Sequence, residues 1–88
     1  MDISAVGHLF KELDDDEVLR IELVNDSKIY CLPSDKVYID IYTGGVRISK
    51  PIKDKRQKII IDVNAIAVVC TMSRITYDLK LNRGELYV

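Results

Sequence analysis

Residues 58–70 read KIIIDVNAIAVVC, and this apolar stretch decides the fold that the sequence predicts. Isoleucine and valine dominate it, and their β-branched side chains are stiff and pack well on a pleated sheet. We therefore predict a strand buried on both faces, with residues 65–70 the most enclosed because apolar residues there occupy both parities. Asp62 and Asn64 interrupt the run, which predicts a bend or bulge. The central core should then contain Ile61, Val63, Ile66 and Val68.

The length of 88 residues predicts a single domain, 1–88, with one modest core, because a chain of this size buries roughly 60–65% of its unfolded surface. Hydrophobic residues make up 48% and charged residues 31%, which is typical of a globular rather than a disordered chain. A cofactor domain has no room, so we expect no cofactor. The net charge of −1 argues against binding polyanions by bulk attraction, so any nucleic-acid contact must be local.

The two cysteines, Cys31 and Cys70, lie in apolar strand-like contexts without a CxxC spacing or a neighbouring histidine. This pattern favours free buried thiols in a reducing compartment over a disulfide. The N-terminus lacks the pattern of a secretory signal, and the longest apolar run, residues 65–70, is far below the roughly 20 residues of a membrane span. We expect a cytoplasmic protein with no membrane contact.

The N-terminal segment carries the pattern of an amphipathic helix. Ile3, Val6, Phe10 and Leu13 recur at spacings of three and four, which predicts a helix over about residues 3–13 that packs on a sheet. The acidic run DDDE at residues 14–17 would meet the negative end of the helix dipole, so the helix should end by Leu13.

Residues 18–88 read as a β region. Leu19, Ile21 and Leu23 alternate with polar residues, which predicts a strand that ends at the turn pair Asn25-Asp26; a helix capped by Asp16 is the alternative. Further strands are predicted over residues 27–32 and 36–42, with Pro33-Ser34-Asp35 as the turn between them. A two-residue Gly44-Gly45 loop within residues 43–46 would lead into residues 47–49, and Pro51 would end that strand.

The remaining segments complete the predicted architecture. Residues 53–58 read as a charged loop, residues 74–81 alternate as a strand, and residues 85–88 form a short terminal strand. The fold class is therefore mainly β (small α+β): an N-terminal helix followed by six or seven short, mostly antiparallel strands that form a small barrel or a curled sheet.

Catalysis needs a constellation of side chains that this chain does not show. His8 is the one histidine, and it lies away from the apolar stripe of its helix. Four adjacent carboxylates at residues 14–17 do not have the spacing of an EF-hand loop, and Gly44-Gly45 lacks the lysine and serine or threonine of a phosphate-binding loop. We predict no enzyme, no metal site and no small-molecule substrate.

One basic concentration stands out as a candidate contact with RNA or a protein partner. It comprises Lys50, Lys53, Lys55, Arg56 and Lys58, and Tyr38 and Tyr42 share one parity on a neighbouring strand. Cations in a loop can bind phosphates, and tyrosine rings can stack on bases. The plain alternative is that loops are charged and that tyrosines cover the outer face of a thin sheet.

Two segments resemble the Sm-like family of the bacterial RNA chaperone Hfq. Residues 18–29, VLRIELVNDSKI, follow a short helix and resemble the first strand and turn of Hfq, and residues 60–69, IIDVNAIAVV, are similar to the late segment in which a strand, a short turn and an Ala-Ile pair lead into the last strand. Asp26 replaces the turn glycine, and Ile61-Asp62-Val63 stand where Hfq has Tyr-Lys-His. The resemblance implies an Sm-like small barrel that assembles through edge strands, and it carries over no RNA-binding residue.

The sequence thus predicts a non-catalytic binding or assembly module that forms homo-oligomers and has RNA as a candidate ligand. An exposed strand edge or the C-terminal residues Leu86, Tyr87 and Val88 would make the contact between subunits. The acidic run at residues 14–17 and the basic residues 50–58 would suit contact between unlike surfaces of neighbouring copies. The alternative is a small accessory or regulatory protein of a phage or other mobile element that acts only through protein contacts.

Overall fold

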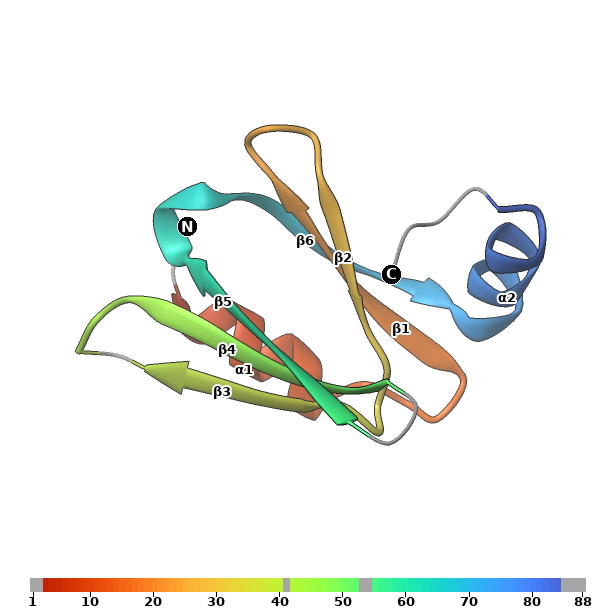
Figure 1. Cartoon of the computed structure of the whole chain (residues 1–88), viewed down its shortest axis with the longest axis horizontal. Helices are drawn as coiled ribbons and strands as arrows, with labels where there is room; N and C mark the ends of the chain where they lie inside the picture. The colour runs from red at the N-terminus through yellow and green to blue at the C-terminus, as the bar shows by residue number, and fades with distance from the viewer. Residues whose placement is uncertain (1–2, 41, 53–54, 85–88) are drawn as a thin grey trace.

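The computed structural model describes residues 3–40, 42–52 and 55–84, with the backbone alone for residues 51, 52, 55 and 56 (Figure 1). Two α-helices, six strands and one 3-10 turn follow one another. They are α1 (Ile3–Lys11), β1 (Glu17–Leu23), β2 (Lys28–Cys31), β3 (Lys36–Asp40), β4 (Gly45–Ile52), β5 (Lys55–Asp62), the turn η1 (Val63–Ala65), β6 (Ile66–Ser73) and α2 (Arg74–Asn82). None of the helices in these ranges is long and apolar enough to cross a membrane.

The strands form two antiparallel sheets of three strands each, in the orders β2-β1-β6 and β3-β4-β5. Residues 32–35 lead from β2 in the first sheet to β3 in the second, and η1 leads from β5 back to β6 in the first sheet (Figure 1). The mainly β, small α+β prediction is confirmed. The described strands do not close into a barrel, because their hydrogen-bonded pairing is divided between two sheets.

The stretch that decided the predicted fold is two strands rather than one. β5 ends at Asp62, whose side-chain oxygen Oδ1 accepts a hydrogen bond of 2.8 Å from the Asn64 N–H and so caps η1. The bend predicted at Asp62 and Asn64 is therefore confirmed, and the single strand buried on both faces is wrong. β6 is an edge strand of the described sheet. Its register with β1 shifts between Ile66 and Val68, so Val68 faces away from the core side on which Ile66 lies, and both Ala67 and Val68 are exposed.

The main core lies between the two sheets. Its buried members are Val6, Leu19, Ile21, Cys31, Val46, Ile48, Ile61 and Ile66. α1 packs against β3, where Gly7 permits the approach because a Cβ at that position would lie 3.0 Å from Ile39 Cγ1. The predicted core positions Ile61 and Ile66 are confirmed, whereas Val63 is half-buried and Val68 is 45% exposed.

α2 occupies residues that the sequence predicted as a strand. Ser73 caps this helix, with Oγ accepting a 3.2 Å hydrogen bond from Thr76 N–H, and Arg74 pairs with Asp78 one turn later at 3.1 Å. These two helix-specific contacts prevail over the apolar alternation of residues 75–81. The helix docks by Tyr77, which packs with Tyr30 at 5.6 Å between ring centroids and with Val18 on the outer face of the first sheet.

The hairpin around the second sheet also departs from prediction. β3 ends at Asp40 opposite Gly45, so the connection is residues 41–44 with Gly44 at φ 70°, not a two-residue Gly-Gly loop. β4 continues through Pro51 to Ile52, and β5 begins at Lys55, so most of the predicted charged loop is strand. Pro51 is tolerated because β3 begins at Lys36, opposite Ser49. Beyond Ser49, β4 therefore has a hydrogen-bonded neighbour on one side only, which is β5.

Candidate nucleic-acid interface

The outer face of the second sheet gathers cationic and aromatic side chains, and the strand register explains how. Alternate residues of β3, β4 and β5 point inward to the core, among them Ile39, Val46 and Ile61. Their neighbours in the strands point outward and line up across the sheet. Two outward rows result: Lys36, Ser49 and Lys58 in one, and Tyr38, Arg47 and Ile60 in the next.

These outward side chains are open to solvent. Tyr38 is 58% exposed and Ile60 73%, and Lys36, Arg47 and Lys58 are also exposed. Together they border a hollow of about 400 Å³, which Ser49 and the edges of Ile48 and Ile59 also line. We call Lys36, Tyr38, Arg47, Lys58 and Ile60 the basic face.

A third outward row brings negative charge to one end of the basic face. Asp40 Oδ2 lies 3.8 Å from Arg47 Nη2, and Asp40 Oδ1 accepts hydrogen bonds from the Tyr42 and Thr43 N–H groups at 3.0 and 3.3 Å. Hydrogen bonds from the Thr43 hydroxyl and from the two N–H groups, with a smaller effect of Arg47, lower the pKa of Asp40. Asp40 thus stays ionised close to Arg47, while Lys36 and Lys58 have no ion pair with a described residue.

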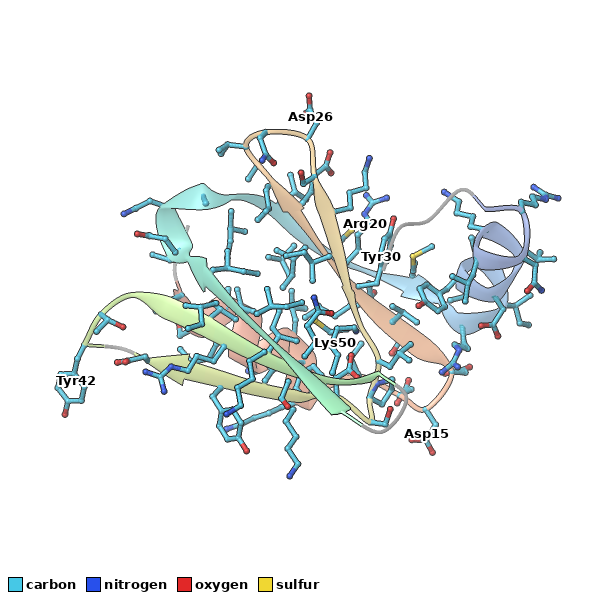
Figure 2. All side chains as sticks on the ribbon, in the orientation of Figure 1. Asp15, Arg20, Asp26, Tyr30, Tyr42 and Lys50 are labelled. Atoms are coloured by element: carbon cyan, nitrogen blue, oxygen red, sulfur yellow. The ribbon has the colours of Figure 1, made fainter. Side chains whose placement is uncertain are left out.

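The structure separates the candidate residues that the sequence grouped together. Lys58 and Tyr38 lie on the basic face, and Tyr42 lies at the tip of the β3–β4 connection, 93% exposed (Figure 2). Lys53 and the tail residues Leu86, Tyr87 and Val88 lie outside the described residues. Lys55 and Arg56 are placed in β5 by their backbone, and their side chains are not described.

Lys50 is not on the surface where it was expected. Its side chain is 7% exposed and its Nζ donates to Asp35 Oδ2 and to the Tyr30 carbonyl oxygen (Figure 2). Lys50 lies one residue out of phase with the outward residues Arg47 and Ser49, so it points between the sheets. It joins β4 to the segment that links β2 and β3, and it cannot contact RNA from there.

Lys36 and Arg47 are the site residues that sequence reasoning missed. Lys36 precedes Tyr38 by two residues in an alternating strand, and Arg47 lies opposite Tyr38 in the hairpin. The cross-strand pairing of the hairpin places Lys36 and Arg47 beside Tyr38. Charge density along the chain does not reveal them, because this face is assembled across three strands.

The other groups considered for chemistry remain apart from the basic face. His8 is a surface residue that pairs with Glu12 at 3.1 Å, and Asp14, Asp15 and Asp16 are exposed before β1. Repulsion from Glu17, aided by its other acidic neighbours, raises the pKa of Asp14. No cluster of three metal-ligating side chains occurs within residues 3–40, 42–52 and 55–84.

Cys31 and Cys70 are free thiols. Burial raises the pKa of Cys31 to about 12, which leaves its thiol protonated and unreactive.

The basic face has the composition expected of a surface that contacts phosphates and bases. Its cations can meet phosphate oxygens, and the exposed ring of Tyr38, on the edge strand β3, can stack on a base. Comparison of the chain with models of protein families, with curated proteins and with solved structures finds no significant match.

Proposed function

We propose that this protein is a non-catalytic RNA-binding and assembly module, a small Sm-like β protein whose RNA-contacting surface is the basic face. The observation that carries the proposal is the row of Tyr38, Arg47 and Ile60 flanked by Lys36 and Lys58, all exposed on one sheet. The chain is slightly acidic overall, so these cations form a local surface rather than part of a general positive charge.

Single-stranded RNA fits this face better than a duplex. A base can stack on Tyr38 only if it is unpaired and splayed from its neighbours, and sequence-tolerant binding of single strands combines such stacking with a cationic track for the backbone. Lys36 and Lys58 lie on opposite edge strands of the sheet, and Arg47 lies between them on β4. A strand of RNA that crosses the sheet can therefore keep its phosphates near cations while one base covers Tyr38.

The Sm-like part of the proposal is supported by connectivity. An N-terminal helix precedes β1, and in the late segment β5, the short turn η1 and the pair Ala65-Ile66 lead into β6, which returns beside β1. Assembly is supported by strand edges that have no neighbour in the described sheets. The exposed Ile60 of β5 and Val68 of β6 lie on such edge strands.

RNA retention measured at several salt concentrations tests the proposed site. Neutralising three phosphates of a single strand predicts a log–log salt slope of about −2. Arg47→Gln should make the slope shallower by roughly one third, and Tyr38→Ala should weaken binding by about 1–3 kcal/mol at every salt concentration. Lys28→Gln is the matched control, because Lys28 is an exposed strand lysine of the other sheet.

The predicted role of Lys53, Lys55, Arg56 and Lys58 is tested in the same assay by changing all four to glutamine. Unchanged retention would remove this segment from the interface. If the intact chain is indifferent to RNA at low and at high salt, the RNA proposal is wrong.

A second function, contact with protein alone, is favoured by the exposed apolar side chains of α2. Ile75 and Leu79 are 74% and 51% exposed and lie one turn apart. In that case Ile75→Gln would abolish partner binding while changes on the basic face would have no effect.

Light scattering on the intact chain and on a chain ending at Asn82 tests assembly and the part that the tail plays in it. A monomeric mass for the intact chain contradicts assembly. An oligomer that survives the truncation excludes the tail from the contact.

A further inference from the structure

We infer that β3 pairs with β3 of a second copy in antiparallel register, so that two basic faces join into one sheet of six strands. This inference rests on the assembly part of the proposed function and names the contact that makes it. β3 is an edge strand of five residues with an uninterrupted register to β4 on its other side. Edge strands present unpaired N–H and C=O groups, which a second strand can satisfy.

The sequence of β3 is complementary to itself. KVYID, read antiparallel to a second KVYID with all five residues paired, places Lys36 opposite the second copy's Asp40, Val37 opposite its Ile39, and Tyr38 opposite its Tyr38. Oppositely charged and aromatic cross-strand pairs each favour such a register. A two-fold axis through the Tyr38 pair then repeats every contact, as an isologous interface requires.

The charged groups at this edge are available for the contact. No described residue forms an ion pair with Lys36. Asp40 Oδ1 accepts the turn hydrogen bonds, and Oδ2 is 3.8 Å from Arg47, which is too far for a hydrogen bond. Asp40 Oδ2 can therefore accept from the second copy's Lys36 without loss of the turn.

The inner side of this edge has space for the partner strand. A groove of about 720 Å³ runs between α1 and β3, lined on the helix by Ala5, His8 and Phe10 and on the strand by Val37, Tyr38 and Ile39. Val37 and Ile39 of each copy stay packed against their own core and α1, so the grooves of the two copies face each other on the inner side of the joined sheet. Because residues of one parity share a face, the second copy's Lys36 and Tyr38 extend the basic face.

The edge strands of the first sheet, β2 and β6, have fewer features that would fix the register of a partner strand. β2 has four residues and is followed within two residues by Pro33, and β6, reading IAVVCTMS, carries no charged side chain that would fix a register.

Pairing through β3 also has a consequence for RNA binding. The joined sheet doubles the number of cations and tyrosines on one continuous surface, so a single RNA strand can engage both copies.

Light scattering at a series of protein concentrations, without RNA, tests the inference on full-length chains. The intact chain should be a dimer, and Lys36→Glu should raise its dissociation constant about tenfold or more, because two symmetric ion pairs become two repulsive pairs. Lys28→Glu, on the edge strand β2, is the matched control and should leave the dimer unchanged. Ala5→Gln should also raise the constant, because it fills the groove with a polar side chain; Ile75→Gln on the exposed side of α2 is its control.

The outcomes separate this inference from the proposed function. A dimer that neither Lys36→Glu nor Ala5→Gln weakens, or that Ile75→Gln dissociates, overturns pairing through β3 and leaves assembly through another surface. A monomeric intact chain overturns both the pairing and assembly. RNA retention by Ala5→Gln at concentrations where it is monomeric reports on the basic face of one copy, since Ala5 lies outside that face. A dimeric intact chain that does not retain RNA at any salt concentration would be a failure of the RNA proposal and not of the pairing.

Discussion

The two sheets share one core but have opposite outer faces. Outside the first sheet, Val18 and Tyr30 are buried because α2 covers them with Tyr77. Outside the second sheet, Tyr38 and Ile60 remain exposed beside the cations Lys36, Arg47 and Lys58. A covered face contributes to stability and an uncovered face is available to a partner, so substitutions of like residues on the two sheets should separate stability from binding.

The largest effect is expected where the two sheets are tied together. Lys50→Ala removes the partner of Asp35, whose side chain is 1% exposed, and leaves a buried carboxylate with one hydrogen bond, from Leu32 N–H. Breaking a buried ion pair in this way should lower the free energy of unfolding by about 3–5 kcal/mol, as measured by urea denaturation.

The matched controls for Lys50 are Lys58→Ala, on the basic face, and the double variant Asp35→Asn with Lys50→Met. The surface change should cost less than about 0.5 kcal/mol, and the double variant should recover part of the loss because no unpaired charge remains. A loss below about 1 kcal/mol for Lys50→Ala would contradict the burial of the pair.

Within the first sheet, the core and solvent sides of β6 should differ strongly. Ile66→Ala should cost about 2–5 kcal/mol because Ile66 is 5% exposed and packs in the main core. Val68→Ala, two residues along the same edge strand and 45% exposed, should cost less than about 1 kcal/mol. Thermal and urea unfolding of the pair test this, and a shift of only a degree or two for Ile66→Ala would show that Ile66 is not enclosed.

These neighbours also show what sequence alone could and could not predict. Periodicity correctly predicted α1, β1 and the outward direction of Tyr38, because local alternation against one core determines each of them. It failed for residues 58–70, where a short apolar run hid a change of sheet at Asp62, and for α2, where only the cap at Ser73 and the Arg74–Asp78 spacing opposed a strand pattern. The basic face could not be read from charge density, since Lys36, Arg47 and Lys58 meet only through strand pairing.

Substitution of one tyrosine on each outer face compares how much each face contributes to stability. Tyr77 is 4% exposed and packs on Tyr30, so Tyr77→Ala should lower stability by about 2–3 kcal/mol and loosen α2. Tyr38→Ala should change stability by no more than about 0.5 kcal/mol, because Tyr38 is 58% exposed. Urea unfolding, with far-UV circular dichroism for the helix, gives both values; equal losses would mean that the two outer faces are covered alike.

The smallest effect is expected at Ile60, and it bears on what the uncovered face does. Ile60 and Ile61 are adjacent in β5 and point to opposite sides, with exposed fractions of 73% and 5%. Threonine keeps the β-branched shape that a strand favours and replaces the ethyl group of isoleucine by a hydroxyl. Ile61→Thr should therefore be strongly destabilising, because apolar volume is lost and the buried hydroxyl needs a partner. Ile60→Thr should stay within about 0.5 kcal/mol of the intact chain in urea unfolding. If Ile60→Thr lowers RNA retention or weakens self-association while stability is unchanged, the exposed isoleucine is part of a contact surface. If Ile60→Thr destabilises the fold as Ile61→Thr does, the outer face of the second sheet is covered in solution, and the contrast between the two sheets fails.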